Sequence, residues 1–219
     1  MDVDLGKAVG QVLGVPFNFM NVGFDSIIPN LGSRFDLGMS SFTDNKKREQ
    51  QVDMVTYFSA GTSFMVKSSS NLAISGLDSL CGHKAGVEKG TTQLDDVTAQ
   101  NTKCQQGGKG KIDVQPYPDE NGVNLALSSG RVDVVLADTP VNNYLVKQAN
   151  GQFKITGPTY GTAPYGIAVP KGSKYAGFAD ALLAALQKTI SDGVYQRILE
   201  KWGIQAGAIS NPVINGAES

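Results

Sequence analysis

Three short segments end in hydroxyl and charged side chains whose types suit a small molecule carrying both charges. They read MSSFT, EKGTT and LADTP, and the first is soon followed by Arg48. A guanidinium can bind a carboxylate through two parallel N–H groups. Thr91 and Thr92 would add hydroxyl donors and would open a helix, whose free N–H groups and positive dipole end favour an anion. Asp138 would hold an ammonium group, so together these residues predict binding of a zwitterion.

Each candidate residue also has a plainer interpretation. Arg48 lies within NKKREQQ, and a run of charges is usually a solvated helix face. Asp138 could serve as the N-cap of a helix expected over Val141–Gln148. Glu88 could form a salt bridge with a lysine at the rim of a site, or contact a cationic or amide group of a ligand. Phe24 could belong to the core or could stack on a ligand.

Strand-like and helical patterns alternate along the chain and predict the elements that position these residues. Apolar residues recur at helical spacing from Leu5 to Leu13, and Gly14 ends this helix. Short strands separated by helices of this length are typical of parallel β-α-β sheets. Strands are expected over Val15–Val22, Phe35–Met39, Lys84–Glu88, Lys111–Val114, Val132–Ala137 and Phe153–Thr156, and helices over Asp25–Leu31, Thr92–Thr102, Asn121–Ser128 and Val141–Gln148.

Two amphipathic helices are expected near the C-terminus, the second over Val194–Trp202. Ser191 or Asp192 would cap the start of this second helix, and Gly203 would cap its end. The apolar faces of both helices are interpreted as core packing. Residues 205–219 are expected to form a loose tail.

Two segments rich in Ser, Gly, Thr or Pro are interpreted as crossings between two lobes. They are VKSSS, from Val66 to Ser70, and GTAPY, from Gly161 to Tyr165. Cutting the chain there gives an outer lobe of residues 1–66 plus 164–219 and an inserted lobe of residues 67–163. A lobe inserted through two strands makes a hinge with a cleft, and clefts between domains commonly bind small ligands.

Composition excludes several classes of function. The 219 residues are 41% hydrophobic and 18% charged, as is ordinary for a globular protein, and the net charge of −1 favours neither nucleic acid nor an acidic membrane. No apolar run approaches the roughly 18 residues of a membrane-spanning helix. The chain contains no nucleophile-elbow, phosphate-loop, dinucleotide-binding or paired-histidine motif, so we expect neither an enzyme nor a cofactor or metal.

Cys81 and Cys104 allow two interpretations. As buried thiols they would carry no information. As a disulfide they would close a loop and indicate an oxidising compartment, and their polar, glycine-flanked surroundings favour this second interpretation.

Several motifs resemble one family closely. They are FDLGMSSFTDNKKREQQVDMVTYFSAGTSFMV, LCGHKAGVEKGTTQ, SGRVDVVLADTP, PYGIAVPKGS and the closing LEKWG. In order and spacing they resemble the amino-acid-binding solute receptors of ABC importers, known as extracellular solute-binding protein family 3, across nearly the whole chain. The cysteine pair and the NPVINGA tail are similar to actinobacterial members. The resemblance implies a two-lobed α/β fold of the type II periplasmic-binding-protein class, with mostly parallel sheets flanked by helices.

The resemblance also implies roles for individual residues. Arg48 would bind the ligand's carboxylate and Asp138 its ammonium group. Thr92 would donate its amide and hydroxyl to the carboxylate, and Glu88 falls where members vary to read the side chain. The remaining expected contacts are Phe24, stacking on the side chain, Ser41 and Thr43, meeting the ammonium group, and Thr91 beside Thr92.

Members of the family begin with a strand and a ligand-contacting loop that have no counterpart before Met1, so we expect the first strand of the outer lobe and any export signal to be absent from this chain. The partners implied are a free amino acid, polar or cationic because Glu88 offers a negative charge, and the permease subunits of an importer. The expected location is extracytoplasmic, and a monomer is expected unless a second chain supplies the strand. The alternatives are a prephenate-type dehydratase of the same fold and the ligand-sensing domain of a receptor.

Overall fold

The structure is a computed structural model that describes residues 1–218. It divides into two compact units. Unit 1 comprises residues 1–22, 26–60 and 163–219, and unit 2 comprises residues 23–25 and 61–162. The chain passes between the units after residue 60, within the strand Val52–Lys67, and after residue 162, within the strand Phe153–Pro170, and residues 23–25 also group with unit 2.

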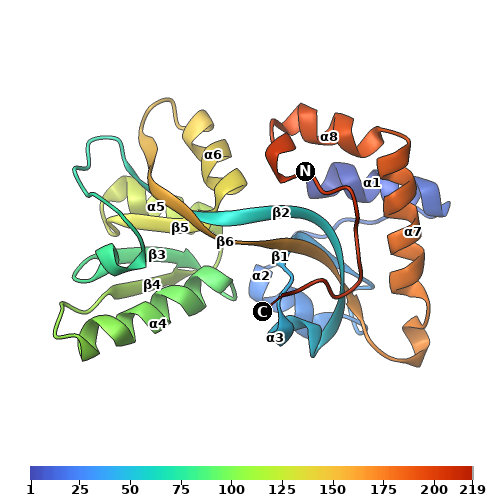
Figure 1. The fold of residues 1–219 in the computed structure, drawn as a ribbon, viewed down its shortest axis with the longest axis horizontal. Coiled ribbons are helices and arrows are strands. Elements are labelled where there is room, and N and C mark those ends of the chain that lie inside the picture. Colours follow the sequence, from blue (N-terminus) through green and yellow to red (C-terminus); the bar gives the residue numbers. More distant parts are fainter. Residues whose placement is uncertain (219) are drawn as a thin grey trace. The chain divides into compact units, whose positions relative to one another are not determined.

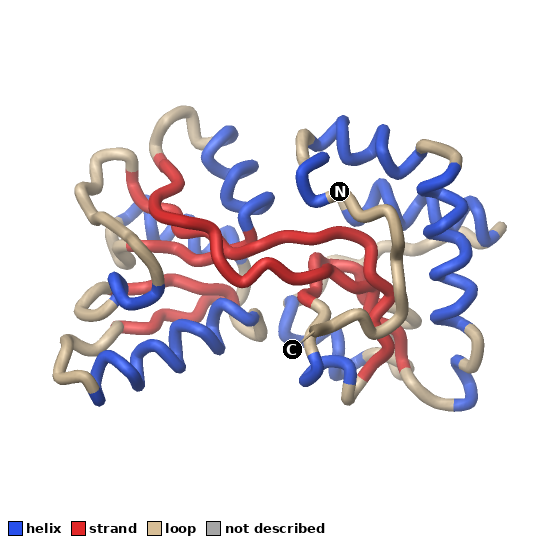
Figure 2. Tube along the Cα trace, viewed as in Figure 1, coloured by secondary structure: helices blue, strands red, loops and turns tan. Residues whose placement is uncertain are grey.

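Unit 1 contains helices at both ends of the chain and the edge of the sheet. Its elements, including the parts of β2 and β6 that it contains, are α1 (Asp2–Leu13), α2 (Phe24–Ile27, whose first two residues group with unit 2), the 3-10 helix Ile28–Asn30, β1 (Gly38–Thr43), α3 (Lys46–Glu49), β2 (Val52–Lys67), β6 (Phe153–Pro170), the 3-10 helix Ser173–Tyr175, α7 (Phe178–Ser191), α8 (Val194–Trp202) and the 3-10 helix Gln205–Gly207. α1, α7 and α8 lie side by side in Figures 1 and 2.

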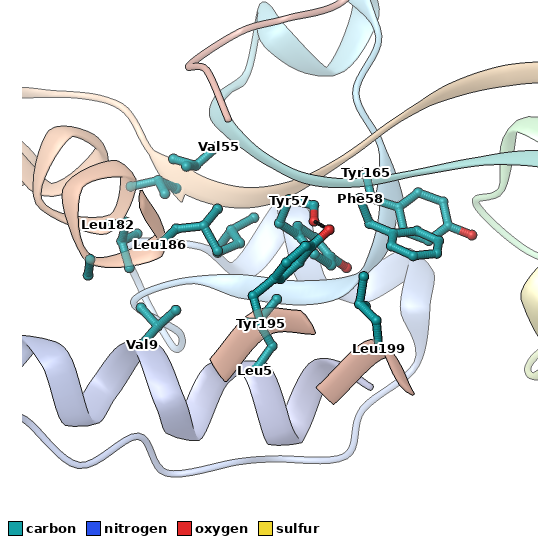
Figure 3. Packing of buried hydrophobic residues seen from close by; sticks show 13 residues of the cluster. Leu5, Val9, Val55, Tyr57, Phe58, Tyr165, Leu182, Leu186, Tyr195 and Leu199 are labelled. Atoms are coloured by element: carbon teal, nitrogen blue, oxygen red, sulfur yellow. Dashed lines mark hydrogen bonds between the residues drawn. The ribbon is translucent and has the colours of Figure 1, made fainter. Parts of the chain in front are cut away.

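The core of unit 1 is formed where these helices cover the long strands. Figure 3 shows Leu5 of α1, Leu186 of α7 and Leu199 of α8 pointing toward the same cluster as Tyr57 of β2. Tyr195 of α8 donates its hydroxyl to the backbone oxygen of Tyr57 at 2.9 Å, which satisfies a polar group inside this core. The helices therefore hold β2 in place just before it leaves unit 1.

Unit 2 is built on the other end of the sheet. Its elements are the 3-10 helix Leu77–Leu80, β3 (Lys84–Glu88), α4 (Thr92–Gln106), β4 (Asp113–Tyr117), α5 (Glu120–Ser129), β5 (Val134–Asp138) and α6 (Thr139–Gln148). Cys81 and Cys104 form a disulfide, with their Cα atoms 5.6 Å apart, which confirms the second interpretation of the cysteine pair.

The sheet has the strand order β1-β6-β2-β5-β3-β4. β3 is parallel to β4 and to β5, whereas the pairs β1–β6 and β2–β5 are antiparallel. The α/β class and the helical flanks are therefore confirmed, and the sheet is mixed, with its parallel part in unit 2. Because β3, β4 and β5 run in one direction, their carboxyl ends lie at one edge, where ligand residues of such sheets gather.

The predicted strand over Val15–Val22 is wrong. These residues follow α1 without strand pairing. The alternating aromatic side chains instead pack on the helix, where ideal Cβ positions on Gly6 and Gly10 would lie 3.1 Å from Phe19 and 3.2 Å from Phe17. The alternation of Phe17 and Phe19, which suggested one face of a sheet, therefore reflects their packing on the glycines of α1.

The predicted loose tail is also wrong for the described residues up to 218. The backbone N–H of Asn215 donates to the oxygen of Met54 at 2.8 Å, and the N–H of Met54 donates to Oδ1 of Asn215 at 2.9 Å. Asn215 also donates to Oδ1 of Asp53 at 3.0 Å. An isolated bridge between Val55 and Ile214 extends this pairing, so the tail adds to the edge of β2.

The start of α8 differs from the expected cap, whereas two helix ends are as expected. α7 continues through Ser191, Asp192 caps its end, and Gly193 precedes α8 in the left-handed region with φ 69°. Gly14 and Gly203 end α1 and α8 with φ 70° and 68°, as glycine at this position allows.

Three acidic side chains, Asp44, Glu49 and Asp53, accept hydrogen bonds from the tail, and Asp44 predicts a pH effect on stability. The N–H of Gly216 donates to Oδ2 of Asp44 at 2.8 Å, while Oδ1 of Asp44 is buried without a hydrogen-bond partner. Burial, reinforced by the charge of Glu49, raises the pKa of Asp44 from 3.8 to about 6. The native state therefore keeps a proton that the unfolded chain releases, and this contribution to stability is lost as the pH rises from about 4 to about 6.

The substitution Asp44→Asn is expected to flatten the pH dependence of the free energy of unfolding over this range, because asparagine keeps the acceptor but does not ionise. Urea denaturation at pH 4, 5, 6 and 7 measures this dependence. Asp36→Asn, an exposed carboxylate of the same unit, is the control. An equal slope in Asp44→Asn and the unmodified chain would contradict the assignment.

Candidate functional site

The candidate site residues of unit 1 lie at the end of β1 and in the short helix after it. Asn45 caps α3 by accepting the N–H of Arg48 at 2.9 Å. The guanidinium then turns back toward β1, where Nη1 donates to the backbone oxygen of Thr43 at 2.8 Å. Its Cζ lies 5.3 Å from the centre of the Phe42 ring, and only 9% of Arg48 is exposed. The guanidinium is therefore oriented by its contacts with β1. The interpretation of Arg48 as part of a solvated helix face does not fit these contacts.

Ser41 has an unusual backbone conformation that a buried network stabilises. Its φ is 51°, in the left-handed region that residues with a Cβ rarely adopt. Its N–H donates to the hydroxyl of Tyr57 at 3.1 Å and its Oγ donates to Asp2 at 3.3 Å, while Tyr57 donates to the same carboxylate at 3.1 Å. Burial raises the pKa of both Asp2 and Tyr57. Asp2 was missed in the sequence, because an acid in the first turn of a helix looks ordinary.

The candidate residues of unit 2 begin at the turn between β3 and α4. Thr91 is the N-cap of α4, and its hydroxyl accepts the N–H of Leu94 at 3.3 Å while donating to the oxygen of Glu88 at 2.7 Å. The hydroxyl of Thr91 therefore already donates one hydrogen bond and accepts another within the protein. Thr92 Oγ donates to Oε1 of Gln93 at 3.4 Å, a long and weak bond.

Asp138 occupies the N-cap position of α6 without using its side chain as a cap. Its Oδ1 instead accepts Nε2 of Gln93 at 2.8 Å, and the same nitrogen donates to Thr62 at 2.7 Å. Gln93 is only 5% exposed, so this amide holds the carboxylate at a fixed orientation. Gln93 was missed in the sequence, although it directly follows Thr92 in the motif that was singled out.

Glu88 ends β3 in acidic surroundings. Burial raises its pKa to about 7, and the charges of Asp119 and Asp25 add to this. Within residues 1–218 no salt bridge joins Glu88 to a lysine, so the rim interpretation has no support. A further acid, Glu120, follows β4, and burial together with the charge of Glu88 raises its pKa to about 8.

The comparisons with known proteins give these groups a context. The model of the bacterial extracellular solute-binding proteins, family 3, matches residues 1–205. The chain belongs to this family. The arginine-binding protein ArgT of Corynebacterium glutamicum is 31% identical over 98% of this chain and 70% of its own.

Solved structures of family members have the same fold. An ancestral arginine-binding protein bound to arginine has a TM-score of 0.83 and is 36% identical, over 92% of this chain and 86% of its own. The ancestral amino-acid-binding protein AncCDT-1, a precursor of cyclohexadienyl dehydratase, has a TM-score of 0.78 and is 27% identical, over 92% of this chain and 83% of its own.

Within the family fold, each unit of this chain brings its own set of candidate residues together. Ser41, Thr43 and Arg48 share the end of β1 in unit 1. Glu88, Thr91, Thr92 and Asp138 share one edge of the sheet in unit 2. Phe24 is half-buried at the start of α2, and its role in binding remains a prediction.

Two features are absent from residues 1–218. No group of three or more His, Cys, Asp or Glu side chains there is placed to hold a metal ion. In the same residues, no helix has the length and hydropathy to span a membrane.

Proposed function

We propose that this solute-binding protein is the extracytoplasmic receptor of an ABC importer and binds a free L-amino acid with a cationic side chain. The observation that supports this most is the fixed guanidinium of Arg48, held at Thr43 while little exposed, in a chain whose relatives include named arginine-binding proteins. Docking on permease subunits and action as a monomer belong to the same proposal. So do the lobe limits of residues 1–66 plus 164–219 and 67–163.

Each charged end of the amino acid has a residue suited to it. Arg48 would bind the α-carboxylate, aided by backbone N–H groups at the start of α4, including that of Thr92. Asp138 would bind the α-ammonium group, since Gln93 already orients its carboxylate. Ser41 and Thr43 would add oxygen acceptors near the ammonium group, and Phe24 would stack on the side chain. A ligand lacking either charge would lose one of these two charge-assisted contacts, and its affinity would fall accordingly.

A screen of the twenty amino acids by thermal shift tests this proposal. Ligand at a hundred times its dissociation constant stabilises the native state by about 2.7 kcal/mol, so binders raise the melting temperature measurably. We expect L-arginine, L-lysine or L-ornithine to give the largest shift, and their D-isomers and decarboxylated amines none. A flat response to all amino acids would refute the proposal.

A second candidate function is a dehydratase that acts on a cyclic carboxylate. The similarity to AncCDT-1, a precursor of an enzyme, makes this worth testing. Glu88, with its pKa raised to about 7, would be able to act as a general acid near neutral pH. Incubation with prephenate-like acids and detection of product would favour this candidate over the receptor.

A further inference from the structure

The carboxyl ends of three neighbouring strands bring several carboxylates together in unit 2. β3 lies between β4 and β5 and is parallel to both, and its last residue, Glu88, pairs with Tyr117 at the end of β4. Asp119 and Glu120 come shortly after Tyr117, and Asp138 ends β5. The topology of the sheet alone therefore places these acidic residues at one edge.

At this edge, three buried side-chain atoms of two residues lack a hydrogen-bond partner within the described part of the chain. Asp119 accepts the N–H of Gly122 at 2.8 Å and so caps α5, and Asp138 is held by its bond to glutamine. By contrast, Oε2 of Glu120 is buried without a hydrogen-bond partner in residues 1–218, and the same holds for both amide atoms of Asn124. The two residues lie one turn apart on the same face of α5. A buried polar group without a partner destabilises a fold, so Oε2 of Glu120 and Oδ1 of Asn124 would be stabilised by a donor from outside the chain, and Nδ2 of Asn124 by an acceptor.

The charges around these side chains indicate which kind of donor fits. The charged neighbours with the largest effect on Glu120 are Glu88, Asp138 and Asp119, and those on Glu88 are Asp119 and Asp25. All of them are carboxylates, and burial, reinforced by their repulsion, raises the pKa of Glu88 to about 7 and that of Glu120 to about 8. A cation placed among them would relieve this repulsion. The cation that the proposed function supplies is organic, namely the side chain of a cationic amino acid.

We propose that Glu120, with Asn124 and Glu88, forms a subsite that binds the cationic side chain of the ligand and selects it over a neutral side chain. The inference rests on the proposed function, because it names the group that recognises the ligand's side chain. A guanidinium has five N–H donors in a plane, so it can donate both to the carboxylate of Glu120 and to the amide oxygen of Asn124. A neutral amide such as that of glutamine can donate but cannot neutralise the carboxylates.

The test compares L-arginine and L-glutamine on three forms of the chain by titration calorimetry. The forms are the unmodified chain, Glu120→Gln and the control Asp113→Asn. Asp113 begins β4 at the opposite edge, is exposed and accepts only a surface bond from Gln115 at 3.0 Å. Glu120→Gln is expected to weaken arginine binding by roughly ten- to a hundredfold, the effect of losing a hydrogen bond to a charged group, and to change glutamine binding by less than about threefold.

Proton release gives a second readout that a structural role would not change. Glu88 and Glu120 hold protons near neutral pH, so a bound cation lowers their pKa and displaces on the order of one proton. The released protons are counted by repeating the arginine titration at pH 7 in buffers of different ionisation enthalpy. Arginine binding should weaken as the pH falls below 7, and the proton release should decrease in Glu120→Gln but not in Asp113→Asn.

Each outcome is decisive. A selective loss of arginine binding and of proton release in Glu120→Gln supports the subsite. Equal weakening of both ligands, or no change, overturns it while the amino-acid receptor stands. Binding of glutamine but not arginine by the unmodified chain overturns the subsite and the cationic ligand of the proposed function, while the amino-acid receptor stands. Failure to bind any amino acid refutes the proposed function and the subsite with it.

Discussion

Replacing Arg48 by alanine is expected to weaken amino-acid binding by roughly 2–5 kcal/mol, as for truncating one member of a buried charge pair. The size follows from the surroundings of the guanidinium. Arg48 is only 9% exposed, and its guanidinium lies over the ring of Phe42 and donates to Thr43. In Arg48→Ala, water would therefore not readily take the place of the guanidinium as the donor to the ligand's carboxylate. Calorimetry with L-arginine and L-glutamine measures the loss, which should be similar for both because they share the α-carboxylate.

Two further variants separate charge from geometry at this position. Arg48→Lys keeps the charge but loses the planar fork, so it should recover only part of the affinity. Arg197→Ala removes an equal charge from the exposed face of α8 and should leave binding unchanged. Unaltered affinity in Arg48→Ala, with the melting temperature also unchanged, would remove this residue from the site.

Signals that act within a few residues were interpreted correctly from the sequence. Gly14 and Gly203 end helices because the left-handed conformation there depends on the glycine itself. Thr91 marks the start of α4 for a similarly local reason, since its hydroxyl caps the turn just after it. The short helix that contains Arg48 also depends on a nearby residue, because Asn45 caps it by accepting the N–H of Arg48.

The sequence failed where a distant part of the chain decides the outcome. The tail is ordered because Asn215 pairs with Met54, far away along the chain. The alternating aromatic residues after α1 were predicted to form a strand because their spacing does not show that they pack on Gly6 and Gly10 of the preceding helix. Glu120 was missed because a first-turn acid after a capping Asp119 is common on helices. Glu120 stands out only in the fold, which brings it close to Glu88 and Asp138 at the ends of the neighbouring strands.

The disulfide is the second feature with a large expected effect, because it closes the segment that contains Glu88, Thr91 and Thr92, three of the eight candidate site residues. Cys81 and Cys104 are 23 positions apart, and the loop between them contains β3, Glu88, Thr91 and most of α4. Constraining the unfolded chain over a loop of this length contributes about 3 kcal/mol to stability. Reducing the disulfide should lower the free energy of unfolding by about this amount, which chemical denaturation with and without reductant measures.

Reduction replaces no residue, so it removes the covalent bond without the change of side-chain volume that a mutation would add. The loss should fall on unit 2, since both cysteines lie there, and hydrogen exchange should rise in β3 and α4 rather than in α7 and α8. If the bond instead served only local packing at the end of α4, exchange would rise around Cys104 alone, with little change in the unfolding midpoint. Uniform protection across β3 and α4 after reduction would contradict the view that this covalent link keeps Glu88 and the start of α4 in position for a ligand.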